Sequence, residues 1–144
     1  MNNQNEKYFK AYIGKNYDKI VNQKFSIPAF FLGGLYLFYR KATLVGIIYT
    51  IIYAVCQLMN KNISLICCLI AMTALGLTFK KIYLKHVEKE ISKLKNKTAS
   101  EEELIKLCNE KGGTASAILT TIGWFFYYGM LLLFLSLLIT AIFK

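Results

Sequence analysis

The chain has 144 residues, 56% of them hydrophobic, and a net charge of +10. Its charged residues are segregated from long apolar runs. A bilayer requires such segregation, because a charge at the membrane centre costs about 2.5–3.5 kcal/mol. The segregation excludes an ordinary soluble domain. The basic residues flank apolar segments, which points to membrane orientation and anionic headgroups and argues against a nucleic-acid partner. The charged residues lie at 6–24, 40–41 and 80–111, with Lys61 and Lys144 isolated.

Residues 1–24 are expected to form a cytoplasmic amphipathic N-terminal helix. Apolar residues recur at steps of three and four, with lysines between them and Gly14 in the middle. This stripe fits the membrane surface, where aromatic rings lie at headgroup level, and it equally fits packing on the protein's own cytoplasmic part. No secretory signal is visible, because polar and amphipathic residues come first. The stripe comprises Phe9, Tyr12, Ile13, Tyr17, Ile20 and Val21.

Residues 25–41 are expected to form an interfacial or re-entrant aromatic segment. The apolar run 28–39 would reach only about 18 Å as a helix, whereas the hydrocarbon core is about 30 Å thick. Gly33 and Gly34 allow a bend within it. The closing residues are candidates for contacts with lipid headgroups, and a simple topological anchor is the alternative. These candidate residues are Tyr39, Arg40 and Lys41.

Residues 42–79 are expected to form a transmembrane helical hairpin. The uncharged stretch 42–59 would reach about 27 Å, just enough to cross, and 63–79 would cross back. A small residue stands at every fourth position of the first stretch, which predicts a helix-packing seam. The seam residues are Ala42, Gly46, Thr50 and Ala54.

Residues 80–113 are expected to form a cytoplasmic helical hairpin. The preceding helix should continue to about Lys95, and Ser100 with Glu103 resembles a capping box that opens a second helix. Two amphipathic helices can bury their apolar stripes together, and a dimerising coiled coil is the alternative. The stripes are Leu84, Val87, Ile91 and Leu94 in the first helix and Leu104, Leu107 and Cys108 in the second.

Residues 114–144 are expected to contain a C-terminal transmembrane helix. The uncharged run 114–143 would reach about 45 Å as a straight helix, more than one crossing needs. The aromatic sequence at 124–128 predicts a belt at the inner membrane boundary. The crossing itself is expected at 125–143.

These segments predict an all-α membrane protein with about three transmembrane helices, a short interfacial or re-entrant aromatic helix and a cytoplasmic helical hairpin. Sixteen basic residues lie on one side of the expected crossings and two on the other. By the positive-inside rule, the N-terminus is predicted inside and the C-terminus outside a bacterial cytoplasmic membrane. Its expected surroundings are a lipid bilayer with anionic headgroups.

Two pieces of the N-terminal region resemble a known family. Residues 12–18 (YIGKNYD) are similar to an aromatic-aliphatic-Gly-Lys-Asn start, and residues 25–41 (FSIPAFFLGGLYLFYRK) to an aromatic run closed by Tyr-Arg-Lys. Both are similar to domain-of-unknown-function family 2628. Ile27, Gly34 and Tyr36 depart from it, standing where Trp, Pro and Trp are common. The resemblance implies a small bacterial inner-membrane protein and carries over no catalytic or binding residue.

No constellation for catalysis or metal binding is found in the sequence. His86, the single histidine, is expected to form a solvated pair with Glu90 one turn on. The expected crossings contain no acidic residue or histidine, so no proton relay is predicted. Cys56 and Cys67 flank the 60–62 connection, where they can face one another or simply pack. We therefore expect no enzymatic activity, no cofactor and no metal.

Two classes of function fit these features. The first is a non-enzymatic small subunit, scaffold or accessory factor with a membrane-protein partner or a second copy of itself. This class fits because the sequence has a helix-packing seam but no set of catalytic residues. The alternative is a self-associating pore or channel, holin-like or for small solutes. The second class has less support, because the expected crossings carry only Ser, Thr, Cys and Gln57 as polar lining.

Overall fold

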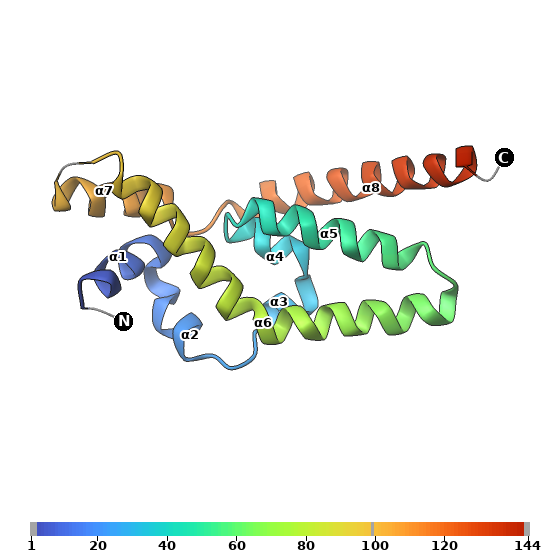
Figure 1. Cartoon of the computed structure of the whole chain (residues 1–144), viewed down its shortest axis with the longest axis horizontal. Helices are drawn as coiled ribbons and strands as arrows, with labels where there is room; N and C mark the ends of the chain where they lie inside the picture. The colour runs from blue at the N-terminus through green and yellow to red at the C-terminus, as the bar shows by residue number, and fades with distance from the viewer. Residues whose placement is uncertain (1–2, 99, 143–144) are drawn as a thin grey trace. The chain divides into compact units, whose positions relative to one another are not determined.

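The computed structural model describes residues 3–98 and 100–142. This part of the chain is 85% helix and has no strand (Figure 1). The all-α class predicted from the sequence is therefore confirmed. The chain divides into two compact units, one of Met1–Ser26 with Leu77–Thr114 and the other of Ile27–Gly76 with Ala115–Lys144.

The first unit joins segments that are far apart in the sequence. Residues 1–24 and 80–113, expected above as separate segments, belong to this one unit. The long helix α6 contributes its second half here and its first half to the other unit. The helices of the first unit are α1 (Asn3–Ile13), the 3-10 turn η1 (Gly14–Asn16), α2 (Tyr17–Asn22), α6 (Lys61–Lys95) and α7 (Glu101–Lys111).

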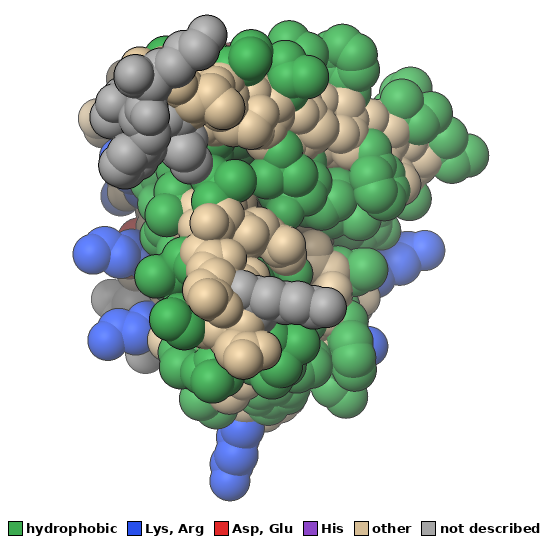
Figure 2. All heavy atoms as spheres, turned by 90° about the vertical axis from the view of Figure 1, so that its right-hand side faces the viewer, with side chains coloured by type: hydrophobic (Ala, Val, Ile, Leu, Met, Phe, Trp, Pro, Cys, Tyr) green, Lys and Arg blue, Asp and Glu red, His purple; other side chains and the backbone are tan. Residues whose placement is uncertain are grey.

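The second unit holds the most apolar helices. Seen from the side where α5 and α6 connect, many hydrophobic side chains lie on the surface (Figure 2). Besides the first half of α6, its helices are α3 (Ile27–Leu32), α4 (Gly34–Tyr39), α5 (Thr43–Gln57) and α8 (Ala117–Ile142).

Two of the described helices, α6 and α8, are long and apolar enough to cross a membrane. Helix α5 was expected as a crossing over 42–59, but it has only 15 residues and reaches about 22 Å. It is apolar yet shorter than a standard span. The crossing expected at 125–143 falls within α8, which begins earlier, at Ala117. Lys144, used above to orient the chain, lies outside the described residues.

Gly14 divides the N-terminal helix. It adopts a positive φ of 71°, a conformation that glycine reaches without steric cost, and α1 ends just before it. After the short turn η1 the chain resumes as α2. The predicted apolar stripe faces inward, with Ile13 and Ile20 each only 1% exposed. Of the two interpretations left open by the sequence, the structure supports packing on the protein itself.

The core of the first unit is built around the second half of α6. Phe79 and Tyr83 stack with their ring centroids 5.4 Å apart, and the buried stripe continues along the helix through Val87, Ile91 and Leu94. The stripe predicted from the sequence is thus buried inside the unit rather than presented for a coiled coil. Leu84 is the exception, because it is only half-buried. The buried partners from the other helices include Tyr12, Ile20, Leu104 and Cys108.

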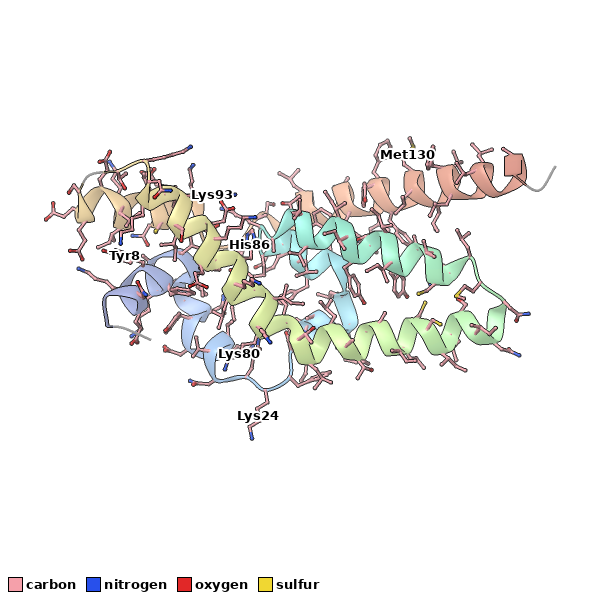
Figure 3. The ribbon with its side chains drawn as sticks, viewed as in Figure 1. Tyr8, Lys24, Lys80, His86, Lys93 and Met130 are labelled. Atoms are coloured by element: carbon pink, nitrogen blue, oxygen red, sulfur yellow. The ribbon has the colours of Figure 1, made fainter. Side chains whose placement is uncertain are left out.

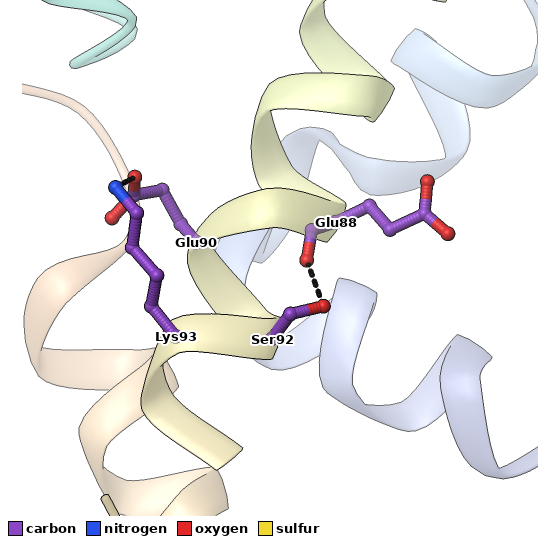
Figure 4. A network of polar contacts seen from close by, with 4 residues as sticks. All are labelled: Glu88, Glu90, Ser92 and Lys93. Atoms are coloured by element: carbon purple, nitrogen blue, oxygen red, sulfur yellow. Dashed lines mark hydrogen bonds and ion pairs between the residues drawn. The ribbon is translucent and has the colours of Figure 1, made fainter. Parts of the chain in front are cut away.

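The exposed face of α6 carries local polar contacts. Lys93 pairs with Glu90 at 2.6 Å, and the Ser92 hydroxyl donates to the carbonyl oxygen of Glu88 at 2.9 Å (Figure 4). The capping box predicted at Ser100 is wrong: Ser100 is the N-cap residue of α7, but its side chain makes no cap hydrogen bond. Ser100 is exposed, so water can serve the first amide groups of the helix instead.

A glycine also breaks the aromatic segment of the second unit. Gly33 has φ 51° and ψ −124°, a region that is essentially closed to residues with a Cβ. The run 27–39 therefore forms two short helices, α3 and α4. Helix α4 ends in a Schellman motif: Lys41 takes φ 60°, and the Ala42 N–H donates to the carbonyl oxygen of Leu37 at 2.9 Å. This turn sends the chain directly into α5.

Candidate functional site

The predicted packing seam lies on the buried face of α5. Ala42, Gly46, Thr50 and Ala54 are all buried. Helix α4 packs on this face, and a Cβ added at Gly46 would lie 3.1 Å from the ring of Phe38. Small residues thus let the two helices approach closely. The partner of the seam in this structure is the protein's own α4, joined by α8.

The predicted headgroup trio has one member turned inward. Arg40 is only 4% exposed, and its Nε and Nη2 atoms both donate to the Tyr36 hydroxyl at 3.2 Å. The guanidinium also lies over the Tyr36 ring, 5.4 Å from its centroid. Tyr39 and Lys41 are half-buried. Headgroup contacts remain a prediction for the trio, and the visible role of Arg40 is to hold the end of α4.

Aromatic rings join α5 to α8. Trp124 stacks on Tyr128 with a centroid distance of 5.1 Å and an interplanar angle of 4°. Tyr53 of α5 lies 6.3 Å from Tyr128 and also stacks on Tyr49. Phe125 and Phe126 point outward instead and are 62% and 73% exposed. The sequence 124–128, predicted as one aromatic belt, is therefore divided by the helical period into an inward and an outward face.

A small cavity lies where α3, α4, α5 and α8 meet. Its volume is ≈ 90 Å³, and Gly33 and Gly34 form part of its wall. A Cβ added at Gly34 would stand 2.3 Å from the Thr50 hydroxyl oxygen and 3.2 Å from Trp124 Nε1. Glycine is thus required for this close approach. The other lining residues are Phe30, Phe31, Leu32, Tyr49, Tyr53 and Met72.

Two polar atoms beside this cavity are buried. Within the described part of the chain, neither Tyr49 Oη nor Trp124 Nε1 has a hydrogen-bond partner. The Thr50 hydroxyl, in contrast, donates to the carbonyl oxygen of Gly46 at 2.7 Å. No carboxyl, histidine, cysteine or lysine lines the cavity. Its lining therefore suits the binding of a small, mostly apolar group that can accept a hydrogen bond, rather than nucleophilic attack by a thiol or an amine.

The paired cysteines of the hairpin face one another. Cys56 and Cys67 lie near one another across the hairpin, as one of the two alternatives from the sequence predicts, and both cysteines are free and half-buried. Sulfur atoms are visible between α5 and α6 near the connection of these helices (Figure 3). No group of three or more metal-ligating side chains occurs among the residues that the structure describes.

Burial and neighbouring side chains shift the pKa values of several titratable groups in the first unit. Burial, with Glu90 and Tyr83 nearby, raises the pKa of Tyr12 to about 12. Burial also raises the pKa of the Cys108 thiol. The hydrogen bond from Lys93 lowers the pKa of Glu90, with His86 as a weaker contribution. Glu90 thus pairs with Lys93, and the nearby His86 also favours its charged form.

No family model, curated protein or solved structure matches this chain. The resemblance of residues 12–41 to domain-of-unknown-function family 2628 accordingly stays a prediction.

The cavity wall was not predicted from the sequence. Gly33 and Gly34 were expected only to permit a bend, and Trp124 was assigned to a membrane belt. They meet because α8, far along the chain, packs beside α4. The one sequence signal that pointed there was Thr50, a small polar residue of the packing seam.

Proposed function

We propose that the protein is a non-enzymatic integral membrane protein that acts as a small subunit, scaffold or accessory factor. One observation carries this proposal: none of the candidate span in α8 is buried by the rest of the described chain. The core helix of a soluble protein would be mostly buried. Exposed apolar surface of this extent is unfavourable in water, but it suits lipid and the helices of a membrane partner.

The exposed residues of α8 lie on more than one face. Phe126, Met130, Leu133 and Leu137 follow one helical face, and Phe125 and Leu138 lie on either side of it. A helix that is apolar all round is typical of a membrane span. The cavity beside Trp124 has no carboxyl, histidine, cysteine or lysine in its lining, which supports a binding role over an enzymatic one.

We further propose three crossings in a bacterial cytoplasmic membrane, formed by α5, the apolar half of α6 and α8, with the N-terminus inside. The shortness of α5 is compatible with crossing if the bilayer thins locally at modest cost. Sixteen basic residues on the proposed inner side, against two outside, support this orientation. The resemblance to family 2628 supports a small bacterial inner-membrane protein.

Purification in mild detergent tests the proposed role. We expect the protein to co-purify with a membrane-protein partner or with a second copy of itself. A lone monomer in every preparation would contradict the role, and a chain that stays soluble without detergent would contradict the membrane assignment. Dye release from liposomes at high protein load would favour the pore alternative instead.

Labelling in whole cells tests the orientation. In a background with all native cysteines replaced by serine, we expect a cysteine at position 144 to react with an impermeant maleimide. The matched control is Lys97→Cys, at an exposed position of the first unit, which should be shielded until the cells are opened. The reverse pattern would overturn the orientation.

A further inference from the structure

Several lysines line a large groove in the first unit. Its volume is ≈ 950 Å³, and Lys24, Lys80, Lys81 and Lys85 line it, with Glu88 as the single acidic residue among the lining. Lys24, Lys81 and Lys85 are exposed. None of these three forms an ion pair with any residue that the structure describes. We call this feature the basic groove.

Two further side chains shape the basic groove. Lys80 donates to the carbonyl oxygen of Val21, in the last turn of α2, where a cation is favourable. In Figure 3, Lys80 lies on α6, and Lys24 extends away from the ribbon beyond α2. Gln23 also lines the groove, and its Nε2 donor is buried with no hydrogen-bond partner in the described part of the chain.

The rest of the groove lining is apolar. Phe9, Val21, Leu77 and Leu84 provide it. A free phosphate or a nucleic-acid backbone has no hydrocarbon part that could be buried against this apolar lining. A ligand with a charged head and a hydrocarbon part matches both surfaces, because its apolar part leaves water while its phosphate meets the lysines.

The place of the groove along the sequence favours the same ligand. Lys80 and Lys81 directly follow the apolar stretch of α6 that forms a candidate membrane span. Lys24 directly precedes the aromatic segment that begins the other unit. Basic residues at the ends of membrane segments lie at the level of the lipid phosphates.

We propose that the basic groove binds the phosphate headgroup of an anionic phospholipid. Lys24, Lys81 and Lys85 provide the positive charge, Gln23 Nε2 provides a hydrogen-bond donor, and the apolar lining receives the start of the acyl chains. The inference rests on the proposed membrane crossing of α6.

Native mass spectrometry of the purified full-length chain tests this inference. The protein in mild detergent is mixed with equal amounts of phosphatidylglycerol and phosphatidylcholine, and the retained lipids are counted. We expect a preference for phosphatidylglycerol of about tenfold, since each basic residue near a phosphate contributes favourably. The combined variant Lys24→Gln, Lys81→Gln, Lys85→Gln should lose that preference.

A matched variant distinguishes lipid binding at the groove from a general effect of the protein's positive charge. Lys89→Gln, Lys97→Gln and Lys106→Gln remove the same charge from exposed positions of the first unit that do not line the groove. This variant should keep the preference. Equal loss in both variants, or no preference in the unmodified chain, would overturn the inference. Circular dichroism checks that both variants remain helical.

Competition identifies the source of the phosphate. If neither inorganic phosphate nor a homopolymer RNA displaces the bound phosphatidylglycerol, the result supports a lipid site. Displacement by inorganic phosphate would show a free-anion site, and displacement by RNA a nucleic-acid site, and either result overturns the inference. A protein that needs detergent but shows no lipid preference contradicts the groove alone and leaves the proposed function standing.

Discussion

Gly113 donates its backbone N–H to the carbonyl oxygen of Tyr12 at 2.7 Å, and this bond joins the end of α7 to the end of α1. The neighbouring Gly112 is buried, and its N–H donates to the carbonyl oxygen of Cys108 at 2.9 Å. Two segments about a hundred residues apart in the sequence are thereby fixed in the first unit. The two glycines directly follow Lys111, the last residue of α7, and they also allow α1 and α7 to meet.

Gly112→Ala should therefore damage the first unit. An added Cβ would stand 2.0 Å from the carbonyl oxygen of Tyr12, and backbone atoms cannot move aside as a flexible side chain can. We expect a loss of at least about 2 kcal/mol in unfolding free energy, with faster amide hydrogen exchange in α1 and α7. Gly123→Ala is the control, because nothing lies within 4 Å of its added Cβ. Equal exchange in both variants would argue against the contact.

Gly34→Ala should close the cavity beside Trp124. The new methyl group would meet the Thr50 hydroxyl oxygen at 2.3 Å and Trp124 Nε1 at 3.2 Å. We expect a destabilisation of about 1–3 kcal/mol and a changed fluorescence spectrum from the single tryptophan.

A double variant tests the origin of that strain. Thr50→Ala removes the nearest atom, so Gly34→Ala with Thr50→Ala should cost less than the sum of the two single changes. Strict additivity would mean that the two residues do not touch. Gly129→Ala, with open space around its added Cβ, is the control for tryptophan fluorescence.

Mild oxidation should link Cys56 to Cys67. The two cysteines lie near one another across the hairpin, and a disulfide can form where the two Cα atoms come within about 7 Å. With oxidised glutathione as the oxidant, we expect an intramolecular species that migrates faster on a non-reducing gel. Cys56→Ser and Cys67→Ser should each abolish it, whereas Cys108→Ser should not. Formation of the same species in the Cys67→Ser variant would refute the pairing.

The first unit should lose stability at alkaline pH. Burial raises the pKa of Tyr12 to about 12 in the folded chain, against about 10 when unfolded. A raised pKa means that the stabilisation is fully present below pH of about 10 and declines as the pH rises through about 12. Absorbance titration of tyrosinate should show one fewer late-ionising group in Tyr12→Phe than in the unmodified chain. A Tyr12→Phe curve identical to that of the unmodified chain would contradict this assignment.

Local patterns in the sequence determined most helix positions. The apolar run before Lys80 and the amphipathic run after it predicted one helix to about Lys95, and α6 ends at that residue. Periodicity also identified the buried faces, such as Ile13 and Ile20 in the N-terminal stripe. These features depend on neighbours within a few residues, which is why a linear pattern contains them.

Only the tertiary structure decided which stripes meet. The N-terminal stripe fitted a membrane surface as well as a protein core, and the fold buried it with α6 and α7. Arg40 could equally have faced lipid phosphates, but the fold leaves its side chain only 4% exposed. The cavity of Gly34 and Trp124 likewise joins residues separated by most of the chain. Such pairings arise from shape complementarity between distant segments. A sequence pattern identifies an apolar face, but it does not identify the segment that packs on that face.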